Sequence, residues 1–328
     1  MNRRHFLQTS GAFAATAATL HAADGAIVGH GALRYKVDKG WAKIDPKKQP
    51  LGNCHSIRAD SKGNVILFQT NTKVDSVIIL DREGKVKDSW GNEYPGAHGL
   101  HLVEEGDDTF LWLTDTNRHV VVKTDIKGKV ITELAFPEAS GKYPNKAKYK
   151  PTAITTAPNG DIYICDGYGT QFIHRYGADG AYKSTFGGPG KGGGQFKTCH
   201  GITVDTRDGK PELVVADRDN YRVQRLTMDG KHIQTMPLPG GRCCDVEVHG
   251  DHLYFPNLNG QCCILNKDLE VVAVLGGAAP IYLDGKLQEM KGDGLFIHPH
   301  GITVDSEGDI YVSEWAAKGR APYKLSRV

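Results

Sequence analysis

One short phrase recurs six times along this chain, and four of its six copies open with histidine. Successive copies begin 43, 54, 48, 44 and 56 residues apart. The copies are His55-Ser-Ile-Arg-Ala-Asp60, His98-Gly-Leu-His-Leu102, Thr152-Ala-Ile-Thr-Thr156, His200-Gly-Ile-Thr-Val-Asp205, Cys244-Asp-Val-Glu-Val-His249 and His300-Gly-Ile-Thr-Val-Asp305. A repeat of roughly 40–50 residues built from short strands is typical of a β-propeller blade. The sequence therefore predicts an all-β fold, a six-bladed β-propeller with one blade for each copy.

The segment between residues 200 and 235 indicates how one blade is built. Four short apolar or alternating stretches, at 202–205, 212–216, 222–226 and 232–235, are separated by turns rich in Asp and Gly. This pattern predicts four-stranded antiparallel blades around a central channel. The last blade is short of one strand, and the alternating residues 32–37 are predicted to complete it. Such pairing closes the ring and leaves only short, protected sheet edges.

The N-terminus has the features of an export signal. Arg3 and Arg4 precede a run of small apolar residues that ends near Ala22 and Ala23. This arrangement predicts a twin-arginine signal over residues 1–23, export to the periplasm or the medium, and a single propeller domain over residues 24–328. The alternative is a basic N-terminus without a targeting role. No later stretch approaches the roughly 18 apolar residues of a membrane helix, so no anchor is expected after cleavage.

Charge and cysteine content narrow the range of partners. The formal net charge is +2 and no basic stripe is present, which argues against a nucleic-acid partner. We expect a monomer that acts on a small-molecule or peptide-derived substrate. The seven cysteines leave at least one thiol unpaired or intermolecular, and their spacing contains no CxxC motif. Buried small apolar side chains and one or two disulfides both remain open as interpretations.

The repeat predicts a ring of side chains around the channel, because a propeller places equivalent positions of all blades around one axis. The ring consists of His55, His98, Thr152, His200, Cys244 and His300. His98, His200 and His300 lie on alternate blades, about 120° apart in a six-fold ring. Three imidazoles with solvent in the fourth position are the open arrangement of a catalytic zinc, and copper, iron or manganese also accept such nitrogens. The alternative is that these histidines hydrogen-bond neighbouring blades.

Other side chains are expected close to this ring. His55 and Cys244 are expected to lie beside the metal or to serve as spare ligands, and His298 is expected at the mouth of the channel. Each second strand runs back to the same face, so the residues that follow it are predicted to border the mouth. They are Thr70-Asn71, Asp115-Thr116, Asp166-Gly-Tyr168, Asp217-Arg218, Asn257 and Glu314-Trp315. The predicted cavity has imidazoles on its floor and Tyr, Arg, Asp and Trp on its rim.

Several motifs carry a family resemblance. They are Gly192-Gly-Gly-Gln-Phe196 before His200, Ala216-Asp-Arg-Asp-Asn220 with Arg222-Val-Gln224, His98-Gly-Leu100 with Trp112-Leu-Thr-Asp115 and His119-Val120, Asp166-Gly-Tyr168, and Pro299-His300. The chain thereby resembles NHL-repeat propellers and, more specifically, the peptidyl-α-hydroxyglycine α-amidating lyases. The resemblance spans blades two to four and six, and it weakens in blades one and five.

The resemblance implies a zinc-dependent lyase that cleaves a carbinolamide into an amide and glyoxylate. By matching motif, His98, His200 and His300 correspond to the zinc ligands. Tyr168 corresponds to the catalytic base or metal-facing phenol, and Arg218 to an arginine that orients an anionic substrate.

Three positions differ from the family's pattern. Thr70 stands where the family has a further arginine, and His298 stands where it has a methionine. Gly301 replaces a carboxylate that helps hold a structural calcium. The metal ring itself matches in full.

Two other classes of function remain open. One is a different metal-dependent propeller enzyme, such as a lactonase or another hydrolase, although these enzymes usually hold their metal with carboxylate and asparagine. The other is a non-catalytic binding or scaffold propeller, since the fold hosts many unrelated functions. A scaffold has no need of three alternate-blade histidines beside a tyrosine and an arginine, which favours the enzyme.

Overall fold

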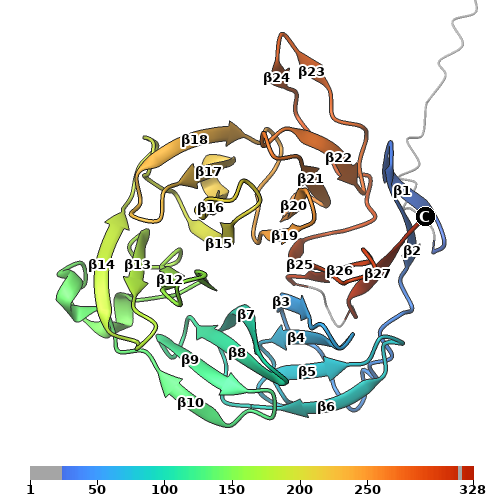
Figure 1. The fold of residues 1–328 in the computed structure, drawn as a ribbon. Coiled ribbons are helices and arrows are strands. Elements are labelled where there is room, and N and C mark those ends of the chain that lie inside the picture. Colours follow the sequence, from blue (N-terminus) through green and yellow to red (C-terminus); the bar gives the residue numbers. More distant parts are fainter. Residues whose placement is uncertain (1–23, 317–319) are drawn as a thin grey trace, which may run out of the picture.

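A computed structural model describes residues 24–316 and 320–328. Over this part of the chain, six antiparallel sheets are arranged as blades around a central channel (Figure 1). The predicted all-β, six-bladed propeller with four-stranded blades is confirmed. The predicted twin-arginine signal falls on residues 1–23, which lie outside the described residues.

The first five blades each consist of four consecutive strands, running from the channel outward. Blade 1 contains β3 (Cys54–Ala59), β4 (Val65–Gln69), β5 (Val77–Leu80) and β6 (Val86–Trp90). Blade 2 contains β7 (Ala97–Glu105), β8 (Asp108–Asp115), β9 (Val120–Asp125) and β10 (Val130–Glu133). Blade 3 contains β11 (Ala153–Thr156), β12 (Ile162–Cys165), β13 (Phe172–Tyr176) and β14 (Tyr182–Gly187). Blade 4 contains β15 (Cys199–Asp205), β16 (Glu212–Asp217), β17 (Arg222–Leu226) and β18 (His232–Pro237). Blade 5 contains β19 (Glu247–His249), β20 (His252–Asn257), β21 (Gln261–Leu265) and β22 (Val271–Leu275).

The sixth blade joins the two ends of the propeller. It contains β25 (Pro299–Val304), β26 (Ile310–Glu314) and β27 (Tyr323–Arg327), followed outward by β2 (Leu33–Asp38) and β1 (Ile27–His30). β2 pairs antiparallel with β27 in a register from Tyr35 opposite Arg327 to Asp38 opposite Lys324. The predicted closure by residues 32–37 is therefore confirmed. The extra strand β1 was not predicted from the sequence; it makes this sheet five-stranded.

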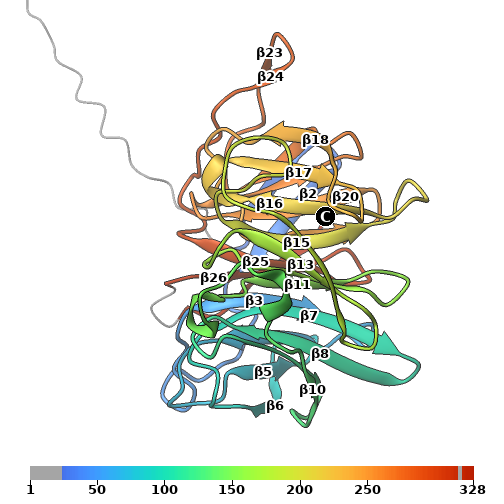
Figure 2. The same cartoon turned by 90° about the vertical axis from the view of Figure 1, so that its left-hand side faces the viewer.

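Helical structure is confined to three short turns in the described residues. These 3₁₀ turns are η1 (Glu138–Ser140), η2 (Lys146–Lys148) and η3 (Arg218–Asn220). No helix among the described residues is long and apolar enough to cross a membrane. A two-stranded hairpin, β23 (Tyr282–Leu283) and β24 (Lys286–Leu287), extends away from the rim of the disc in both views (Figures 1 and 2).

The core lies between adjacent blades. Between blades 1 and 2, for example, Phe68 and Val77 pack in the same buried cluster as Leu111 and Leu113. Burial of apolar surface contributes about 25 cal/mol per Å². Packing against the neighbouring blades therefore stabilises the position of each blade. The inner strands consequently have fixed positions around the channel. All seven cysteines are buried and free, which supports their interpretation as small apolar core residues.

Candidate functional site

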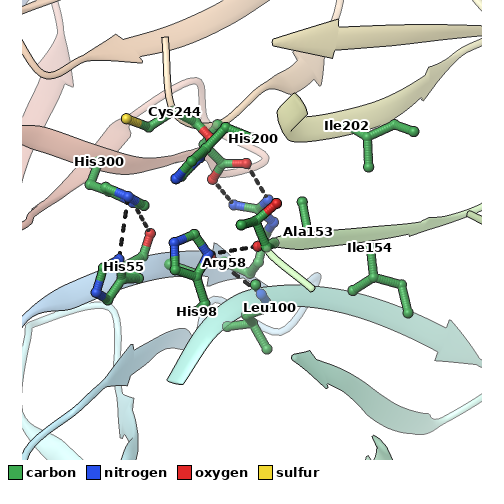
Figure 3. A pocket seen from close by; sticks show the side chains of 14 residues that line it. His55, Arg58, His98, Leu100, Ala153, Ile154, His200, Ile202, Cys244 and His300 are labelled. Atoms are coloured by element: carbon green, nitrogen blue, oxygen red, sulfur yellow. Dashed lines mark hydrogen bonds and ion pairs between the residues drawn. The ribbon is translucent and has the colours of Figure 1, made fainter. Parts of the chain in front are cut away.

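The predicted ring residues line one central channel (Figure 3). Each of the four ring histidines is the second residue of an inner strand. They are His55 on β3, His98 on β7, His200 on β15 and His300 on β25. Thr152 directly precedes β11, and Cys244 lies shortly before β19. The ring centroids of His98 and His200 are 4.7 Å apart, those of His200 and His300 are 4.8 Å apart, and those of His98 and His300 are 5.2 Å apart. The three alternate-blade imidazoles therefore form a nearly equilateral triangle.

Each of these three imidazoles is held by the next ring position. His98 Nδ1 lies 2.7 Å from the Thr152 carbonyl oxygen, and His200 Nδ1 lies 2.6 Å from the Cys244 carbonyl oxygen. His300 Nδ1 lies 2.7 Å from the carbonyl oxygen of His55. A carbonyl only accepts, so Nδ1 carries the proton in all three and Nε2 keeps its lone pair. Metal-binding histidines are fixed in the same way, by donating their second nitrogen to a carbonyl or carboxylate.

A glycine follows each of the three histidines because the neighbouring blade comes very close. A Cβ at Gly99 would lie 2.7 Å from the Thr152 carbonyl oxygen, and one at Gly201 would lie 2.8 Å from that of Cys244. At Gly301 a Cβ would lie 2.9 Å from the Ser56 Cα. These glycines let each inner strand approach the carbonyl that orients the histidine. Gly301 thus has neither the carboxylate of the calcium-holding pattern nor space for one.

Burial keeps the ring imidazoles neutral. It lowers the pKa of His98 to about 3, and the nearby Arg218 acts in the same direction. The pKa values of His55, His200 and His300 are also lowered, first by burial and then by neighbouring imidazoles and Arg218. A neutral imidazole is the form that binds a metal ion.

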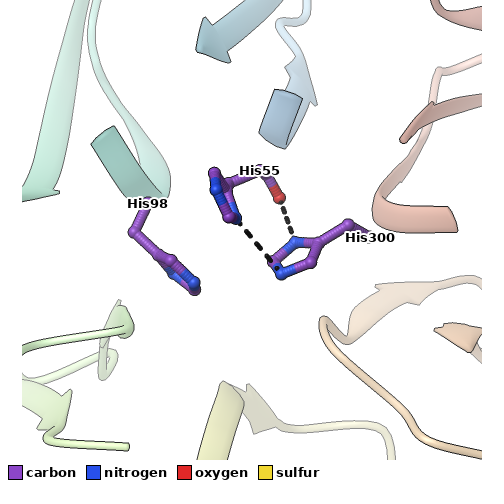
Figure 4. A group of neighbouring side chains, drawn as sticks. All are labelled: His55, His98 and His300. Atoms are coloured by element: carbon purple, nitrogen blue, oxygen red, sulfur yellow. Dashed lines mark hydrogen bonds between the residues drawn. The ribbon is translucent and has the colours of Figure 1, made fainter. Parts of the chain in front are cut away.

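The arrangement fits a metal ion. His98 Nε2 is buried and has no hydrogen-bond partner, although an unpaired buried polar atom is costly. Ligand atoms of His55, His98 and His300 lie within 4.8 Å of one another, as do those of His200, Cys244 and His300 (Figure 4 shows the first group). The structure thus holds His/Cys groups of metal-binding type. The first group contains two of the three predicted ligands, His98 and His300, together with His55. The second contains His200 and His300 together with Cys244.

Tyr168 and Arg218 lie above this ring. Together with His55, His300, Arg242, Leu258 and Trp315 they line a cavity of about 340 Å³ at the mouth of the channel. The Tyr168 hydroxyl lies 2.9 Å from His200 Nε2 and donates to it, because His200 Nδ1 holds the ring proton. Arg218 Nη1 donates to the Tyr168 oxygen over 3.1 Å. A chain of hydrogen bonds therefore runs from the guanidinium through the phenol to the imidazole ring.

Burial and the Arg218 charge shift the pKa of the Tyr168 hydroxyl in opposite directions. Burial raises the pKa of Tyr168, whereas the Arg218 guanidinium lowers it, and the net shift is upward. The phenol is therefore protonated at neutral pH. Arg218 is 9% exposed, and its Nε lies 3.6 Å from Asp219 Oδ1 in an ion pair. A guanidinium that lines a cavity is well suited to recognise an anionic group.

His298 and Cys244 have supporting positions. His298 Nδ1 donates to the carbonyl oxygen of Leu258 over 2.9 Å, and its ring centroid lies 5.6 Å from that of Trp315. His298 therefore lies beside the mouth, where it packs against Trp315, a residue that lines the cavity. The Cys244 thiol is buried and donates weakly to the Arg242 carbonyl oxygen, 3.6 Å away.

The predicted acidic rim is wrong. Asp115, Asp166 and Asp217 are fully buried and point into their blades rather than into the cavity. Asp166 accepts the backbone N–H of Lys150, and Asp217 accepts that of Lys197, in each case from the segment before the inner strand. Gln69, Asp115 and Glu314 accept backbone N–H groups from the equivalent segments of blades 1, 2 and 6. These side chains fix the loops of the mouth because buried backbone donors need partners.

Two features of the channel were missed by the sequence reasoning. Arg58 from blade 1 forms a bidentate ion pair with Asp245 from blade 5, with N–O distances of 2.7 and 2.9 Å, across the channel beside the ring. Both residues lie within the repeated phrases, so their channel position could have been read from the repeat. Arg242 lines the mouth two residues before the ring position of blade 5, in a loop where no repeat signal exists.

Comparisons with known proteins agree with the fold and the resemblance. No protein-family model matches the chain. The chain is 24% identical to human "NHL repeat-containing protein 3", over 87% of this chain and 83% of that protein. It is 28% identical to "peptidyl-alpha-hydroxyglycine alpha-amidating lyase 1" of Drosophila melanogaster, over 85% of this chain. It is 30% identical to a probable lyase of the same name from Caenorhabditis elegans, over 55% of this chain. The resemblance to both groups is confirmed, and the chain spans 58% and 57% of the lengths of the two lyases.

Solved structures share the propeller architecture. A gluconolactonase from Xanthomonas campestris superposes with a TM-score of 0.58 at 14% identity, covering 95% of this chain and 93% of that one. A protein of unknown function from Bacteroides caccae superposes with a TM-score of 0.51 at 12% identity. At these identities the likeness concerns the fold alone.

Proposed function

We propose that this protein is an exported, metal-dependent lyase that cleaves a peptidyl-α-hydroxyglycine-like carbinolamide into an amide and a glyoxylate-type product. The observation that carries the proposal is the triangle of His98, His200 and His300 with Nε2 atoms turned to the channel, directly below the Tyr168–Arg218 pair. The distant homology to amidating lyases supports the same chemistry.

The three histidines would hold a divalent ion, with zinc the first candidate because imidazole nitrogens in an open three-ligand set suit it. When bound, the ion supplies Lewis-acid polarisation of a substrate oxygen at the floor of the cavity. The remaining steps fall to side chains of the mouth.

Arg218 would bind the substrate carboxylate through the part of its guanidinium that lines the mouth cavity, which orients the carbinolamide over the ring. Tyr168 would move the proton. Its protonated phenol donates to the amide nitrogen as the C–N bond breaks, and the hydroxyl proton of the carbinolamide replaces it as the C=O bond forms. The tyrosine ends as it began, and the products are a neutral amide and an aldehyde acid.

A lactonase-type hydrolase is less well supported. Among the described channel-lining residues, Asp245 supplies the carboxylate, and it is bound to Arg58 on both oxygens. It is therefore not free to serve as a ligand or as the base that activates water. A non-catalytic propeller leaves the buried, unpartnered His98 Nε2 without an explanation.

The direct test is turnover of synthetic N-acyl-α-hydroxyglycines by the zinc-loaded protein, with assay of both glyoxylate and amide. We expect equal amounts of the two products, loss of activity in the His98→Ala, His200→Ala and His300→Ala variants, and full activity in His232→Ala, whose side chain is exposed on β18. If the protein binds metal but turns over none of the adducts, the lyase proposal is excluded, and a different metal-dependent enzyme becomes the favoured function.

A further inference from the structure

We propose that His55 is a fourth ligand of the metal ion, bound through Nδ1, so that the resting centre contains four imidazoles rather than three. The inference rests on the proposed function only in requiring a divalent ion at the ring. It concerns this chain's own side chains and holds whichever substrate is used.

The spacing of two nitrogens carries the proposal. His55 Nδ1 lies 3.3 Å from His300 Nε2. This separation is longer than most hydrogen bonds of N–H groups. Two nitrogens at neighbouring corners of a tetrahedral zinc sphere, each about 2.0–2.1 Å from the ion, are about 3.3–3.4 Å apart. The pair already has the spacing of two ligands of one ion.

The surroundings of the pair agree with this role. The ligand atoms of His55, His98 and His300 lie within 4.8 Å of one another, and all three side chains are buried. Figure 4 shows the three imidazoles turned toward a common point in the channel. His98 contributes the buried Nε2 that has no partner. A metal ion would satisfy this atom and the close His55–His300 contact together.

His55 differs from the other ring histidines in how it is held. His98, His200 and His300 each donate Nδ1 to a carbonyl of the next blade and present Nε2. The His55 ring presents Nδ1 instead, and among the described residues its ring hydrogen bond is with His300. In the part of the chain that the structure describes, no backbone carbonyl holds its other nitrogen. His55 would therefore be the most easily displaced of the four ligands, and it also lines the mouth cavity from which a substrate arrives.

Cys244 is the competing fourth ligand, since it groups with His200 and His300. Its thiol is turned to the Arg242 carbonyl oxygen, 3.6 Å away. The ligand atoms of this group lie within 4.8 Å of one another, whereas His55 Nδ1 and His300 Nε2 are 3.3 Å apart. The geometry favours His55, and a Cys244→Ser variant separates the two.

The test is nitrogen NMR of the whole mature protein with selectively ¹⁵N-labelled histidine, before and after one equivalent of zinc. A metal-bound imidazole nitrogen has a characteristic shift, and one-bond correlations identify whether Nδ1 or Nε2 is bound. We expect four imidazoles to respond, three bound through Nε2 and one through Nδ1. The Nδ1-bound signal should vanish in His55→Asn and persist in Cys244→Ser, with His101→Asn, on the same strand as His98, as the matched control.

Zinc affinity, measured by competition with a chelator, gives a second readout. We expect His55→Asn to lower the affinity about 10- to 100-fold and His101→Asn to leave it unchanged. Three zinc-responsive imidazoles, all bound through Nε2, with the His55 signals unaltered by zinc, would overturn the inference and leave the three-histidine centre standing. If no imidazole responds to zinc, the proposed metal-dependent function falls as well.

Discussion

At the scale of single residues, the site depends on which atom of each side chain is free. The carbonyl oxygens of Thr152, Cys244 and His55 hold the Nδ1 protons of three histidines and thereby aim their Nε2 lone pairs at one another. Arg218 similarly donates to Tyr168 through Nη1, while its Nε lies 3.6 Å from Asp219 Oδ1. The metal-ligand, acid and anion-binding roles that we propose rest on these choices of atom.

Replacing Tyr168 by phenylalanine should reduce turnover of the carbinolamide by roughly 100-fold or more, because a positioned proton donor contributes about 10²–10⁴ to the rate. KM should change much less, since the ring of the side chain remains. Steady-state kinetics on the zinc-loaded protein measure both. Tyr221→Phe is the matched control, as Tyr221 is 42% exposed. Equal kcat for Tyr168→Phe and the parent protein would exclude the phenol from the chemistry.

Replacing Arg218 by alanine should act mainly on binding of the carboxylate. We expect KM for anionic substrates to rise at least 10-fold, because a charge-assisted hydrogen bond to a buried guanidinium contributes about 1.5–3 kcal/mol. Arg218→Lys should restore it only in part, since an ammonium lacks the paired donors of the guanidinium. A substrate amide that lacks the carboxylate serves as control. Identical KM changes for the charged and uncharged substrates would contradict the anion-binding role.

At the scale of strands and blades, the strongest feature is the ring closure through β2 and β27. Leu325 on β27 is fully buried, and it lies opposite Val37 on β2 and Ile310 on β26. The side chain therefore ties the N-terminal strand to the last blade. Its cluster also includes residues of blade 5, such as Ile264.

Leu325→Ala should lower the free energy of unfolding by about 2–5 kcal/mol, the range for a buried leucine whose removal leaves a cavity. Urea unfolding followed by circular dichroism measures the change. Leu283→Ala is the matched control and should change stability by less than about 0.5 kcal/mol, because Leu283 is 58% exposed on the β23–β24 hairpin. A loss below about 1 kcal/mol for Leu325→Ala would mean that the closing strand contributes little to the fold.

The channel side of β19 carries a pH-sensitive carboxyl group. Burial raises the pKa of Glu247 from 4.5 to about 7, and the attraction of Arg58 offsets this only in part. Arg58 Nε lies 3.8 Å from Glu247, while its terminal nitrogens are committed to Asp245. The folded protein therefore holds the Glu247 proton more tightly than the unfolded chain does.

The sign of the effect follows from linkage. A raised folded-state pKa contributes stability that is complete below about pH 4.5 and is lost as the pH rises through about 7. The free energy of unfolding of the parent protein, minus that of Glu247→Gln, should fall by on the order of 1–2 kcal/mol between about pH 5 and pH 8. Urea titrations at a series of pH values give this difference. Parallel pH profiles for the two proteins would show that Glu247 is ionised throughout.

At the scale of the whole molecule, features that recur in every blade could be predicted from the sequence. Features that have no counterpart in the repeated phrase could not. The blade number and the ring positions followed from one phrase and its spacing, because a propeller converts equal sequence positions into equal places around an axis. The closing strand followed from the short last blade and the alternating residues 32–37. Tyr168 and Arg218 were placed correctly since the end of a second strand always returns to the mouth. The direction of a side chain is not fixed by this argument. Asp115, Asp166 and Asp217 turned inward to pair buried backbone N–H groups, a demand that the sequence pattern does not display.

Other parts of the site depend on contacts between blades that are distant in sequence. The Arg58–Asp245 ion pair joins residues 187 positions apart, and the close approach of His55 to His300 spans 245 positions. Nothing within one blade predicts the rotation of the His55 ring. Arg242 lies in a loop that has no equivalent in the repeat, so its place at the cavity became visible only in three dimensions.

The central claim is that the ring of histidines holds one divalent metal ion, and metal analysis tests it most directly. The protein and a His98→Ala/His200→Ala/His300→Ala variant are purified side by side, exposed to equal zinc, dialysed and measured by mass spectrometry of the elements, with circular dichroism to verify the fold. We predict about one ion per chain in the parent protein and none in the folded triple variant. Equal metal content in the two proteins, or no retained metal in the parent protein, would contradict the account.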